Sequence, residues 1–376
     1  MALSGMTSRL SSLTSWHADW KGLKVAVLGL GAAGFSAADT LTELGAQVLV
    51  VTEHAPDEYA RLLPVIGAQL IETDREKVAP TVEGFAPDVI VASPGFAPSH
   101  PAVRWAIESA TPLWGDVELA WRVRDKVVRE DGTPAEWILV TGTAGKTTTV
   151  ELASLMLVEG GLRAAPCGAN GVPVLDAVRD PAGFDAFVVE LSSAQLWYLG
   201  LAREEGAPRP LASVCLNLGE VQLDWHESEA QYRDAKAVVY RHTRIACVYN
   251  KHDAATMRMV EDADVTEGAR AVGIDLGVPG PSDLGIVDGI LADRAFVENR
   301  RTSAAELTTL EHLASRGLLA PELVLDVLAA AALSRSMGVE PASIHRALEG
   351  VEYGQRGQVT AEREESVDDD EGPDNG

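Results

Sequence analysis

Lys146 and Thr147 directly follow a glycine-rich turn in the stretch WILVTGTAGKTTTVELASLML, residues 137–157. An apolar run precedes the turn and apolar residues recur at helical spacing after it, which predicts a strand, a loop and a helix. The loop N–H groups, the helix N-terminus and the Lys146 ammonium could together hold a phosphate group, and the Thr147 hydroxyl could bind magnesium. The spacing is shorter than in the usual phosphate loop, because Val140 stands where its first glycine would be. The alternative is a turn that only joins strand to helix and leaves Lys146 solvated.

A second glycine motif, GLGAAG, begins at Gly29 and follows an expected strand at 24–28. A helix is expected to run through Leu44, and a second strand at 47–52 ends beside Glu53. This pattern is typical of a βαβ unit that binds a dinucleotide, with the acid on a ribose. Two alternatives stay open: a turn that serves only packing, and an oxidoreductase that uses a dinucleotide. The oxidoreductase hypothesis leaves the phosphate loop unexplained.

Glu190 lies near the end of an expected strand at 187–191. Two more apolar runs, at 212–217 and 245–250, do not alternate with polar residues, which is typical of parallel strands covered on both faces. Carboxylates at the carboxyl ends of such strands are where α/β sheets place their sites. We therefore expect Glu190 to be a magnesium ligand, and the alternative is a solvated loop acid.

The overall composition limits the possible classes of protein. The chain has 376 residues, of which 46% are hydrophobic, and its formal net charge is −25. Such an acidic chain argues against nucleic acid and anionic membranes as partners. No apolar run is long enough to span a membrane, and we expect neither membrane insertion nor a secretory signal. Three widely spaced cysteines fit a reduced cytoplasm and have no metal-site spacing.

These patterns predict an α/β protein with a Rossmann-like N-terminal domain and a P-loop-type, mostly parallel central domain. A small antiparallel excursion is expected at 270–305, and an apolar core helix at 323–337. We place a loosely docked lead-in at 1–22, the first domain at 23–130, the central domain at 131–350 and a disordered acidic tail at 351–376.

Seven segments between Lys24 and Gly350 together resemble the Mur ligase family, and most closely its D-glutamate-adding members. In chain order they are GLGAAGFSAADTL, VIVASPGF, GDVELAW, GTAGKTTT, VVELSSAQL, LDWH and YRDAKAVVY. The resemblance implies that the first domain binds the UDP of UDP-N-acetylmuramoyl-L-alanine rather than a dinucleotide. It also implies that the central domain binds ATP and Mg2+, forms an acyl phosphate, and lets the amine of D-glutamate attack it.

The resemblance also assigns roles to particular residues. Lys146 and Lys236 are expected to be catalytic, with Lys236 carrying a carbamate that helps to organise a metal, and Thr147 and Glu190 would bind the metal. The expected ATP-binding residues are Gly142, Thr143, Ala144, Gly145, Lys146, Thr147 and Thr148. The expected UDP-substrate-binding residues are Gly29, Gly31, Gly34, Thr52, Glu53, Ser93, Gly95 and Ser192.

The sequence departs from the family pattern at several of the expected site positions. Ala144, Ala169, Gln222 and Leu323 stand where the family has asparagine or histidine, and Asp326 replaces another asparagine. The family's third domain is not recognisable after residue 350. These departures support an alternative hypothesis, a non-catalytic binding or regulatory protein that keeps the ligase scaffold.

Overall fold

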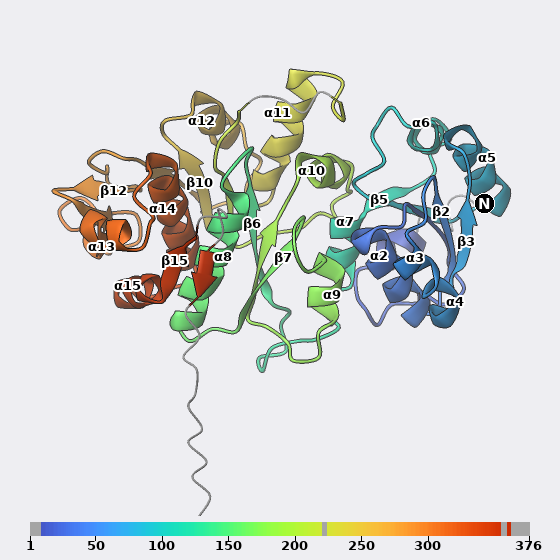
Figure 1. Cartoon of the computed structure of the whole chain (residues 1–376), viewed down its shortest axis with the longest axis horizontal. Coiled ribbons are helices and arrows are strands. Elements are labelled where there is room, and N and C mark those ends of the chain that lie inside the picture. The colour runs from blue at the N-terminus through green and yellow to red at the C-terminus, as the bar shows by residue number, and fades with distance from the viewer. Residues whose placement is uncertain (1–8, 220–223, 355–358, 362–376) are drawn as a thin grey trace, which may run out of the picture.

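The computed structural model describes residues 9–219, 224–354 and 359–361, and it confirms the expected α/β class. Two sheets, each flanked by helices, lie side by side: the first domain is blue and the central domain runs from green to red (Figure 1). Within the described ranges, no helix is long and apolar enough to cross a membrane.

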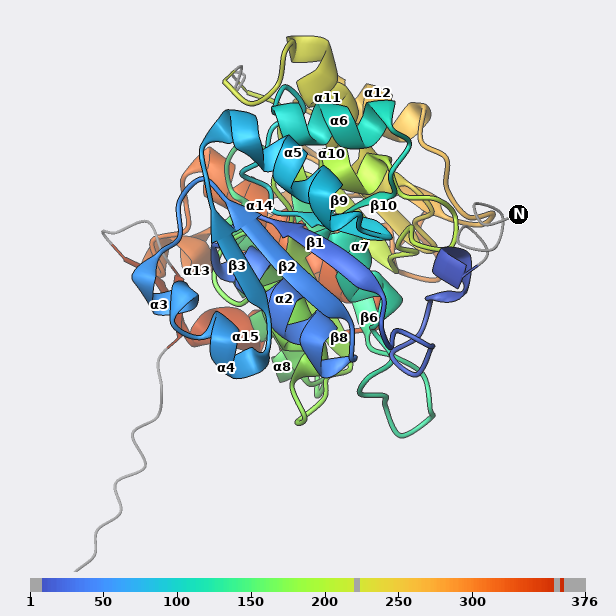
Figure 2. The same cartoon turned by 90° about the vertical axis from the view of Figure 1, so that its right-hand side faces the viewer.

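The first domain is a parallel sheet in the order β3-β2-β1-β4-β5, seen face-on in Figure 2. Its strands are β1 (Lys24–Leu28), β2 (Gln47–Thr52), β3 (Gln69–Glu72), β4 (Val89–Ala92) and β5 (Leu113–Gly115). Its helices are α2 (Ala32–Glu43), α3 (Asp57–Ala60), α4 (Leu63–Ile66), α5 (Arg75–Phe85) and α6 (Pro101–Glu108).

Alternate residues of β1 point into two different cores, which explains why the strand is apolar throughout. Val25 and Val27 pack on the face covered by α2, whereas Ala26 and Leu28 pack on the face covered by α5 and α6. The helix α2 ends at Glu43 with Leu44 as its C-cap, and Gly45 follows with a φ of +82°, which favours glycine.

The central sheet has the order β14-β13-β12-β11-β10-β9-β6-β8-β7, and its pairs from β7 to β12 are parallel. Its strands are β6 (Glu136–Thr141), β7 (Ala164–Gly168), β8 (Ala186–Glu190), β9 (Ala212–Cys215), β10 (Ala246–Asn250), β11 (Arg270–Ile274), β12 (Asp283–Val287), β13 (Ile290–Asp293) and β14 (Ala305–Thr309). The antiparallel excursion expected at 270–305 is confirmed for its later part, because β12–β13 and β13–β14 pair antiparallel, but β11 at its start pairs parallel with both of its neighbours.

Helices cover both faces of the central sheet, as the apolar strands predicted. They are α8 (Lys146–Glu159), α9 (Val174–Arg179), α10 (Ser193–Gly200), α11 (Glu229–Ala237), the 3-10 helix η1 (Val238–Tyr240), α12 (Ala254–Glu261), α13 (Leu310–Ser315), α14 (Pro321–Ser336) and α15 (Pro341–Glu349). Ile138 and Val140 of β6 pack with α8 and α14, whereas Trp137 and Leu139 face the opposite core. The expected core helix at 323–337 is α14, which is buried along most of its length.

Two sequence expectations about the ends of the chain need correction. The lead-in is not loosely docked from residue 9 onward: Leu13 and Trp20 are buried, and Arg122 donates to the carbonyl oxygens of Leu10 (3.3 Å) and Leu13 (3.0 Å). The irregular spacing of its few apolar residues gave no periodic signal. In the expected disordered tail, β15 (Val351–Tyr353) pairs with β16 (Val359–Ala361), because Val351 reaches the core beside α8 and α14. Residues 355–358 and 362–376 lie outside the described residues.

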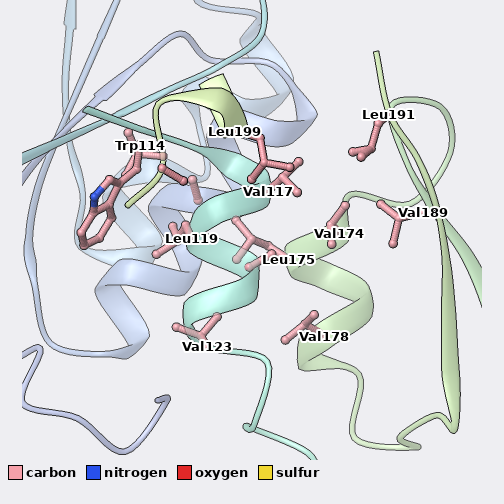
Figure 3. Close-up of a cluster of buried hydrophobic side chains, with 14 of the residues drawn as sticks. Trp114, Val117, Leu119, Val123, Val174, Leu175, Val178, Val189, Leu191 and Leu199 are labelled. Carbon is pink, nitrogen blue, oxygen red and sulfur yellow. The ribbon is translucent and has the colours of Figure 1, made fainter. Parts of the chain in front are cut away.

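The two domains share an apolar core around α7 (Asp116–Arg122), which follows β5 and precedes β6. Figure 3 shows Leu175 and Val178 of α9 turned toward the α7 segment, and Val117, Leu119 and Val123 of that segment belong to the same buried apolar cluster. The boundary that we placed at about 130 falls between α7 and β6. Because this contact is apolar and buried, it holds the two sheets against each other.

Arg179 adds a polar contact beside this core, and we expect the substitution Arg179→Met to weaken the domain junction. Its guanidinium lies 2.7 Å from Asp39 and 2.8 Å from Glu43, both on α2. Partly exposed ion pairs contribute up to about 1 kcal/mol each, so we expect a loss of roughly 1–2 kcal/mol in the free energy of unfolding. Thermal unfolding should show it, and 0.5 M salt should shrink the difference. The matched control is Arg61→Met, whose pair with Asp57 is exposed; equal effects of the two substitutions would contradict this role.

Candidate functional site

The phosphate loop lies between β6 and α8, as the sequence predicted. Gly145 caps α8 with a φ of +82° and a ψ of −9°, in the left-handed region where glycine is favoured. A Cβ at this position would lie 2.3 Å from the Asp326 Oδ1 atom. A glycine is therefore required here both by the backbone conformation and by the space.

Asn217 holds the loop in its closed shape, a role that the sequence analysis missed. Its Oδ1 accepts hydrogen bonds from the backbone N–H groups of Thr143 (3.0 Å) and Ala144 (2.9 Å), and its Nδ2 donates to the Ala144 carbonyl (3.1 Å). The side chain follows β9 at the carboxyl edge of the sheet. The rule that singled out Glu190, a polar residue at the end of an apolar strand, would have found Asn217 too.

Lys146 opens α8 and its side chain turns back over the loop. Its Nζ lies 3.4 Å from the Thr143 carbonyl oxygen, and the side chain is half-buried. The Thr143 hydroxyl in turn contacts the Tyr232 hydroxyl at 2.8 Å and accepts from the Gly219 N–H at 2.9 Å. A positive charge, a helix N-terminus and an ordered loop thus meet at one point, which is the arrangement that binds phosphate.

Thr147 and Glu190, the two expected metal ligands, are brought together. The Thr147 hydroxyl donates to Glu190 Oε2 at 2.9 Å, and the Asn170 amide donates to Glu190 Oε1 at 2.6 Å. Glu190 is buried at the end of β8. Ala169 stands where the family has asparagine, and the next residue, Asn170, does reach the carboxylate.

The oxygens of Thr147 and Glu190 are too few to hold a metal whose ligands all come from the protein, but they suit Mg2+. Mg2+ usually takes one or two protein oxygens and completes its octahedron with water and phosphate oxygens. Among the described residues, no three His, Cys, Asp or Glu side chains gather into a metal site. A hydroxyl and a carboxylate beside the phosphate loop are the donors that such a shared ion needs.

Lys236, the other expected catalytic residue, is buried on α11 against the start of the loop. Its Nζ donates to the Gly142 carbonyl at 2.9 Å and to the Thr141 hydroxyl at 3.3 Å. Burial lowers the pKa of Lys236 to about 8, and the nearby Lys146 acts in the same direction while Cys215 opposes it. A substantial fraction of this amine is therefore neutral, and nucleophilic, slightly above pH 7.

A second polar group near this lysine is His226, which sequence reasoning named only as part of a motif. The imidazole is buried between the rings of Trp225 and Tyr232, at centroid distances of 4.6 and 5.3 Å. Burial, followed by the charge of Lys236, lowers the pKa of His226. The Trp225 indole donates to the Pro94 carbonyl at 2.7 Å, so this segment ties the central domain to the loop that carries Gly95.

Asp326 brings an acid to the phosphate loop. It lies on α14, is 5% exposed, and its carboxyl group packs against Gly145. Burial raises the pKa of Asp326 to about 7; the Thr149 hydroxyl lowers it and Glu322 raises it further. A carboxylate at this position opposes the positive potential made by Lys146 and the helix N-terminus. Leu323, the neighbouring departure, is buried on the same helix, and Gln222 lies outside the described residues.

The glycines of the first domain form a tight cradle at the carboxyl end of β1. Gly29 has a φ of +94°, and a Cβ on Gly34 would lie 2.2 Å from the Gly29 carbonyl oxygen and 2.8 Å from the Ser93 hydroxyl. The Ser93 hydroxyl is buried and has no hydrogen-bond partner among the residues that the structure describes. An unsatisfied buried hydroxyl beside a glycine turn can donate a hydrogen bond to a ligand oxygen or accept one from a ligand N–H group.

The remaining expected substrate residues lie around this cradle in different ways. Glu53 contacts His100 at 2.9 Å and Arg75 at 3.4 Å, and the Thr52 hydroxyl donates to the His54 carbonyl. Gly31 caps α2, and Gly95 has open space where a Cβ would be. Ser192 is the N-cap of α10 in a capping box with Gln195. Gln195 then donates to Asp116 of α7, so Ser192 lies at the junction of the two domains.

The expected residues thus form two groups. The phosphate-loop residues, Glu190 and Lys236 meet around the start of α8, while the glycine cradle and Ser93 lie at the carboxyl edge of the first sheet (Figure 1). Trp225 and the Ser192–Gln195–Asp116 chain connect the groups. The arrangement can hold a nucleoside triphosphate at one group and a second phosphorylated ligand at the other.

Comparisons with known proteins show which proteins this chain resembles. Residues 140–275 match the Mur ligase middle domain. The UDP-N-acetylmuramoylalanine–D-glutamate ligase of Leifsonia xyli subsp. xyli is 56% identical over 336 residues, which are 89% of this chain and 65% of that protein. The ligase of the same name from Tropheryma whipplei (strain TW08/27) is 46% identical over 342 residues, 91% of this chain and 69% of that protein. The chain thus spans about two thirds of the length of these curated relatives.

A solved structure shares the fold. The UDP-N-acetylmuramate:L-alanyl-gamma-D-glutamyl-meso-diaminopimelate ligase from Neisseria meningitides superposes with a TM-score of 0.53 at 16% identity, covering 87% of this chain and 98% of that chain. At this identity the likeness concerns the fold alone. It agrees with a Rossmann-like first domain followed by a P-loop-type central domain.

Proposed function

Because this chain belongs to the UDP-N-acetylmuramoylalanine–D-glutamate ligase family, we propose that it binds ATP and UDP-N-acetylmuramoyl-L-alanine for the addition of D-glutamate in peptidoglycan synthesis. The observation that carries the proposal is the contact of Thr147 with Glu190 at 2.9 Å directly beside Lys146. This contact places two oxygen ligands for Mg2+ beside the loop that would hold the phosphates, at the carboxyl edge of the sheet.

The proposed reaction has two steps. A carboxylate oxygen of the UDP-substrate attacks the γ-phosphorus of ATP, the bond to ADP breaks, and an acyl phosphate forms. The amine of D-glutamate then attacks the acyl carbon, phosphate leaves, and the nitrogen loses a proton. Lys146 and the loop N–H groups would stabilise the charge that moves with the phosphoryl group. Mg2+ held by Thr147 and Glu190 would neutralise more of the phosphate charge.

Two further assignments follow for the rest of the site. Lys236 would react in its neutral form with carbon dioxide, forming an N–C bond and releasing a proton to solvent to give a carbamate, which its lowered pKa favours. The glycine cradle and Ser93 would hold the uridine diphosphate, since Ser93 has an unsatisfied buried hydroxyl. The surroundings of Glu53, occupied by His100 and Arg75, give no specific support for the oxidoreductase hypothesis.

The test is ADP release by this chain with ATP, Mg2+ and UDP-N-acetylmuramoyl-L-alanine, with and without D-glutamate, and with hydroxylamine to trap an acyl phosphate. We expect ADP release that needs both Mg2+ and the UDP-substrate and that Lys146→Ala abolishes. Trapped acyl hydroxamate without D-glutamate incorporation would place the defect in amine binding. Failure of Mg-ATP to bind at all would contradict the proposal.

A second candidate function rests on Ala144 and Asp326. The acid against Gly145 weakens the positive potential of the phosphate loop, and Ala144 lacks the amide of the family asparagine. A non-catalytic relative would keep the glycine cradle and bind the UDP-substrate without ATP. Binding of UDP-N-acetylmuramoyl-L-alanine by calorimetry, with no ATP hydrolysis at high protein concentration, would favour this candidate.

A further inference from the structure

A cavity of about 330 Å3 opens at the seam between the two domains, away from the site described above. Its apolar wall consists of Leu10 from the N-terminal segment, Ile107 of α6, Leu113 and Trp114 of β5, and Leu201 after α10. The volume is at the lower end of the range for small-molecule sites. Because both domains and the segment before them supply the wall, any occupant touches all three parts.

The cavity is separate from the proposed substrate site. Its lining includes Asp88 and Pro112, which precede the parallel strands β4 and β5. Ser93 and Gly115, by contrast, lie at the carboxyl ends of these strands. The two sites are therefore at opposite edges of the same sheet, and a ligand in one leaves the other open.

Glu118 lines this cavity and carries a buried acceptor oxygen that has no donor among the described residues. One of its oxygens, Oε1, accepts from Arg122 Nε at 3.0 Å and from Arg122 Nη2 at 2.8 Å. The other oxygen, Oε2, is buried and finds no hydrogen-bond partner in the part of the chain that the structure describes, and the whole residue is only 1% exposed. A buried carboxylate oxygen without a donor is costly, so a ligand that brings a donor recovers that cost.

The charges in the lining favour a cation over an anion. Three acids, Glu118, Glu205 and Asp88, face two arginines. Arg122 is already engaged, because it donates to Glu118 and to the Leu13 carbonyl and stacks over the Trp114 ring at 4.1 Å. The other arginine, Arg203, is exposed to solvent. An anion would thus meet only one available arginine, whereas a cation would meet the unpaired oxygen of Glu118.

We propose that this seam cavity binds a small primary ammonium or amidinium compound with an apolar body, whose N–H group donates to Glu118 Oε2. The apolar body lies against Ile107, Leu113 and Leu201. Because the ligand bridges the two domains, it fixes their relative position without occupying the proposed UDP or ATP sites.

Binding of such a cation depends on the charge of Glu118. Burial raises the pKa of Glu118 to about 7; Arg122 opposes this shift, Glu205 adds to it and Arg203 opposes it. These are the charged groups that face the carboxyl group. The carboxylate form increases as the pH rises through 7, so a ligand that stays protonated over this range binds more tightly at pH 8 than at pH 6.

The test uses phenethylamine as the probe and 3-phenylpropionate as the matched anion with a similar apolar body. By calorimetry with the full chain, we expect phenethylamine to bind with a Kd on the order of 1 mM or tighter. We expect 3-phenylpropionate to bind at least tenfold more weakly, and phenethylamine to bind several-fold more weakly at pH 6 than at pH 8. Equal binding of the two probes, or no binding of either, would overturn the proposal.

Two variants test whether phenethylamine binds in this cavity. Ile107→Trp fills the mouth of the cavity from an exposed position and leaves the Glu118–Arg122 pair intact, so it should weaken phenethylamine binding at least tenfold. Its control is Val65→Trp, at an exposed residue of α4, which should leave binding unchanged. Glu118→Gln replaces the free acceptor and should weaken binding by a similar factor if the variant melts as a folded protein. Unchanged binding to Ile107→Trp would show that the probe binds elsewhere.

Discussion

Lys146→Ala is expected to weaken binding of Mg-ATP roughly 30- to 150-fold. The side chain is the positive charge at the start of α8, with its Nζ 3.4 Å from the Thr143 carbonyl, so it points over the loop that would hold the phosphates. Hydrogen bonds to charged groups contribute about 1.5–3 kcal/mol, and a loss of 2–3 kcal/mol corresponds to that range of affinity. Calorimetric titration with Mg-ATP measures it.

The control for this substitution is Lys77→Ala on α5, whose ammonium pairs with the exposed Asp74. It removes the same charge from the protein without touching the loop, so its ATP affinity should equal that of the unmodified chain. Thermal unfolding should show that both variants remain folded, because neither side chain lies in an apolar core. If the two variants bind ATP equally well, Lys146 is a solvated lysine and the proposed phosphate site is wrong.

The strand, loop and helix of the proposed phosphate site were predictable because the local sequence pattern dictates their structure. Glycines that allow left-handed backbone, an apolar strand and a helix with a lysine at its start can be recognised without knowledge of the rest of the chain. Gly145 adopts the required positive φ, and Thr147 meets Glu190 across 43 residues because both follow parallel strands of one sheet. The rule that sites gather at carboxyl strand ends therefore sufficed for this pair.

Other residues of the site depend on contacts between distant segments and gave no local signal. The family resemblance singled out Asp326, but no local pattern indicated its contact with Gly145, because the packing of α14 on α8 brings the two together. The lead-in from residue 9 was likewise misjudged, because its order comes from burial in the apolar core and from Arg122, which lies 109 residues after Leu13. The β15–β16 pair depends on a tertiary position of Val351 that no periodicity in three-residue strands can indicate.

Asp326→Asn is expected to strengthen binding of Mg-ATP, with a gain that increases with pH. The Asp326 carboxyl group lies against Gly145, where a Cβ would be 2.3 Å from its Oδ1. Ionised, it repels the phosphates that the loop holds; an asparagine amide in the same place is neutral and can donate a hydrogen bond. At a separation of 6–8 Å and an effective dielectric constant of about 20, repulsion between two unit charges amounts to roughly 2 kcal/mol, before screening by salt. We therefore expect a roughly tenfold gain in affinity at pH 8.

The pH dependence follows from the pKa of this carboxyl group, which burial raises to about 7. At pH 6 the group is mostly protonated and the two proteins should bind ATP with similar affinity. As the pH rises through 7 the wild-type carboxyl group ionises and its affinity falls relative to that of the variant. The protonation of ATP and its binding of magnesium change with pH in the same way for the wild type and for Asp326→Asn. The ratio of the two ATP affinities therefore reports the effect of the Asp326 charge alone. Binding to the wild type near pH 7 should also take up protons, which calorimetry in buffers of different ionisation enthalpy measures.

Asp326→Asn should also change the free energy of unfolding. The direction of the change follows from the difference between the pKa of Asp326 in the folded and in the unfolded chain. The pKa of Asp326 is higher in the folded chain than in the unfolded chain, so the folded state binds more protons between about pH 4 and 7. The wild type therefore loses stability as the pH rises through this window, and the loss is complete above pH 7. Asp326→Asn should remove that loss, which for a pKa raised from 3.8 to about 7 amounts to up to roughly 4 kcal/mol in the free energy of unfolding at pH 8. The control Asp57→Asn, at an exposed acid on α3, should change neither the ATP affinity nor the free energy of unfolding. If the ratio of ATP affinities of wild type and Asp326→Asn does not depend on pH, Asp326 does not face the bound phosphates.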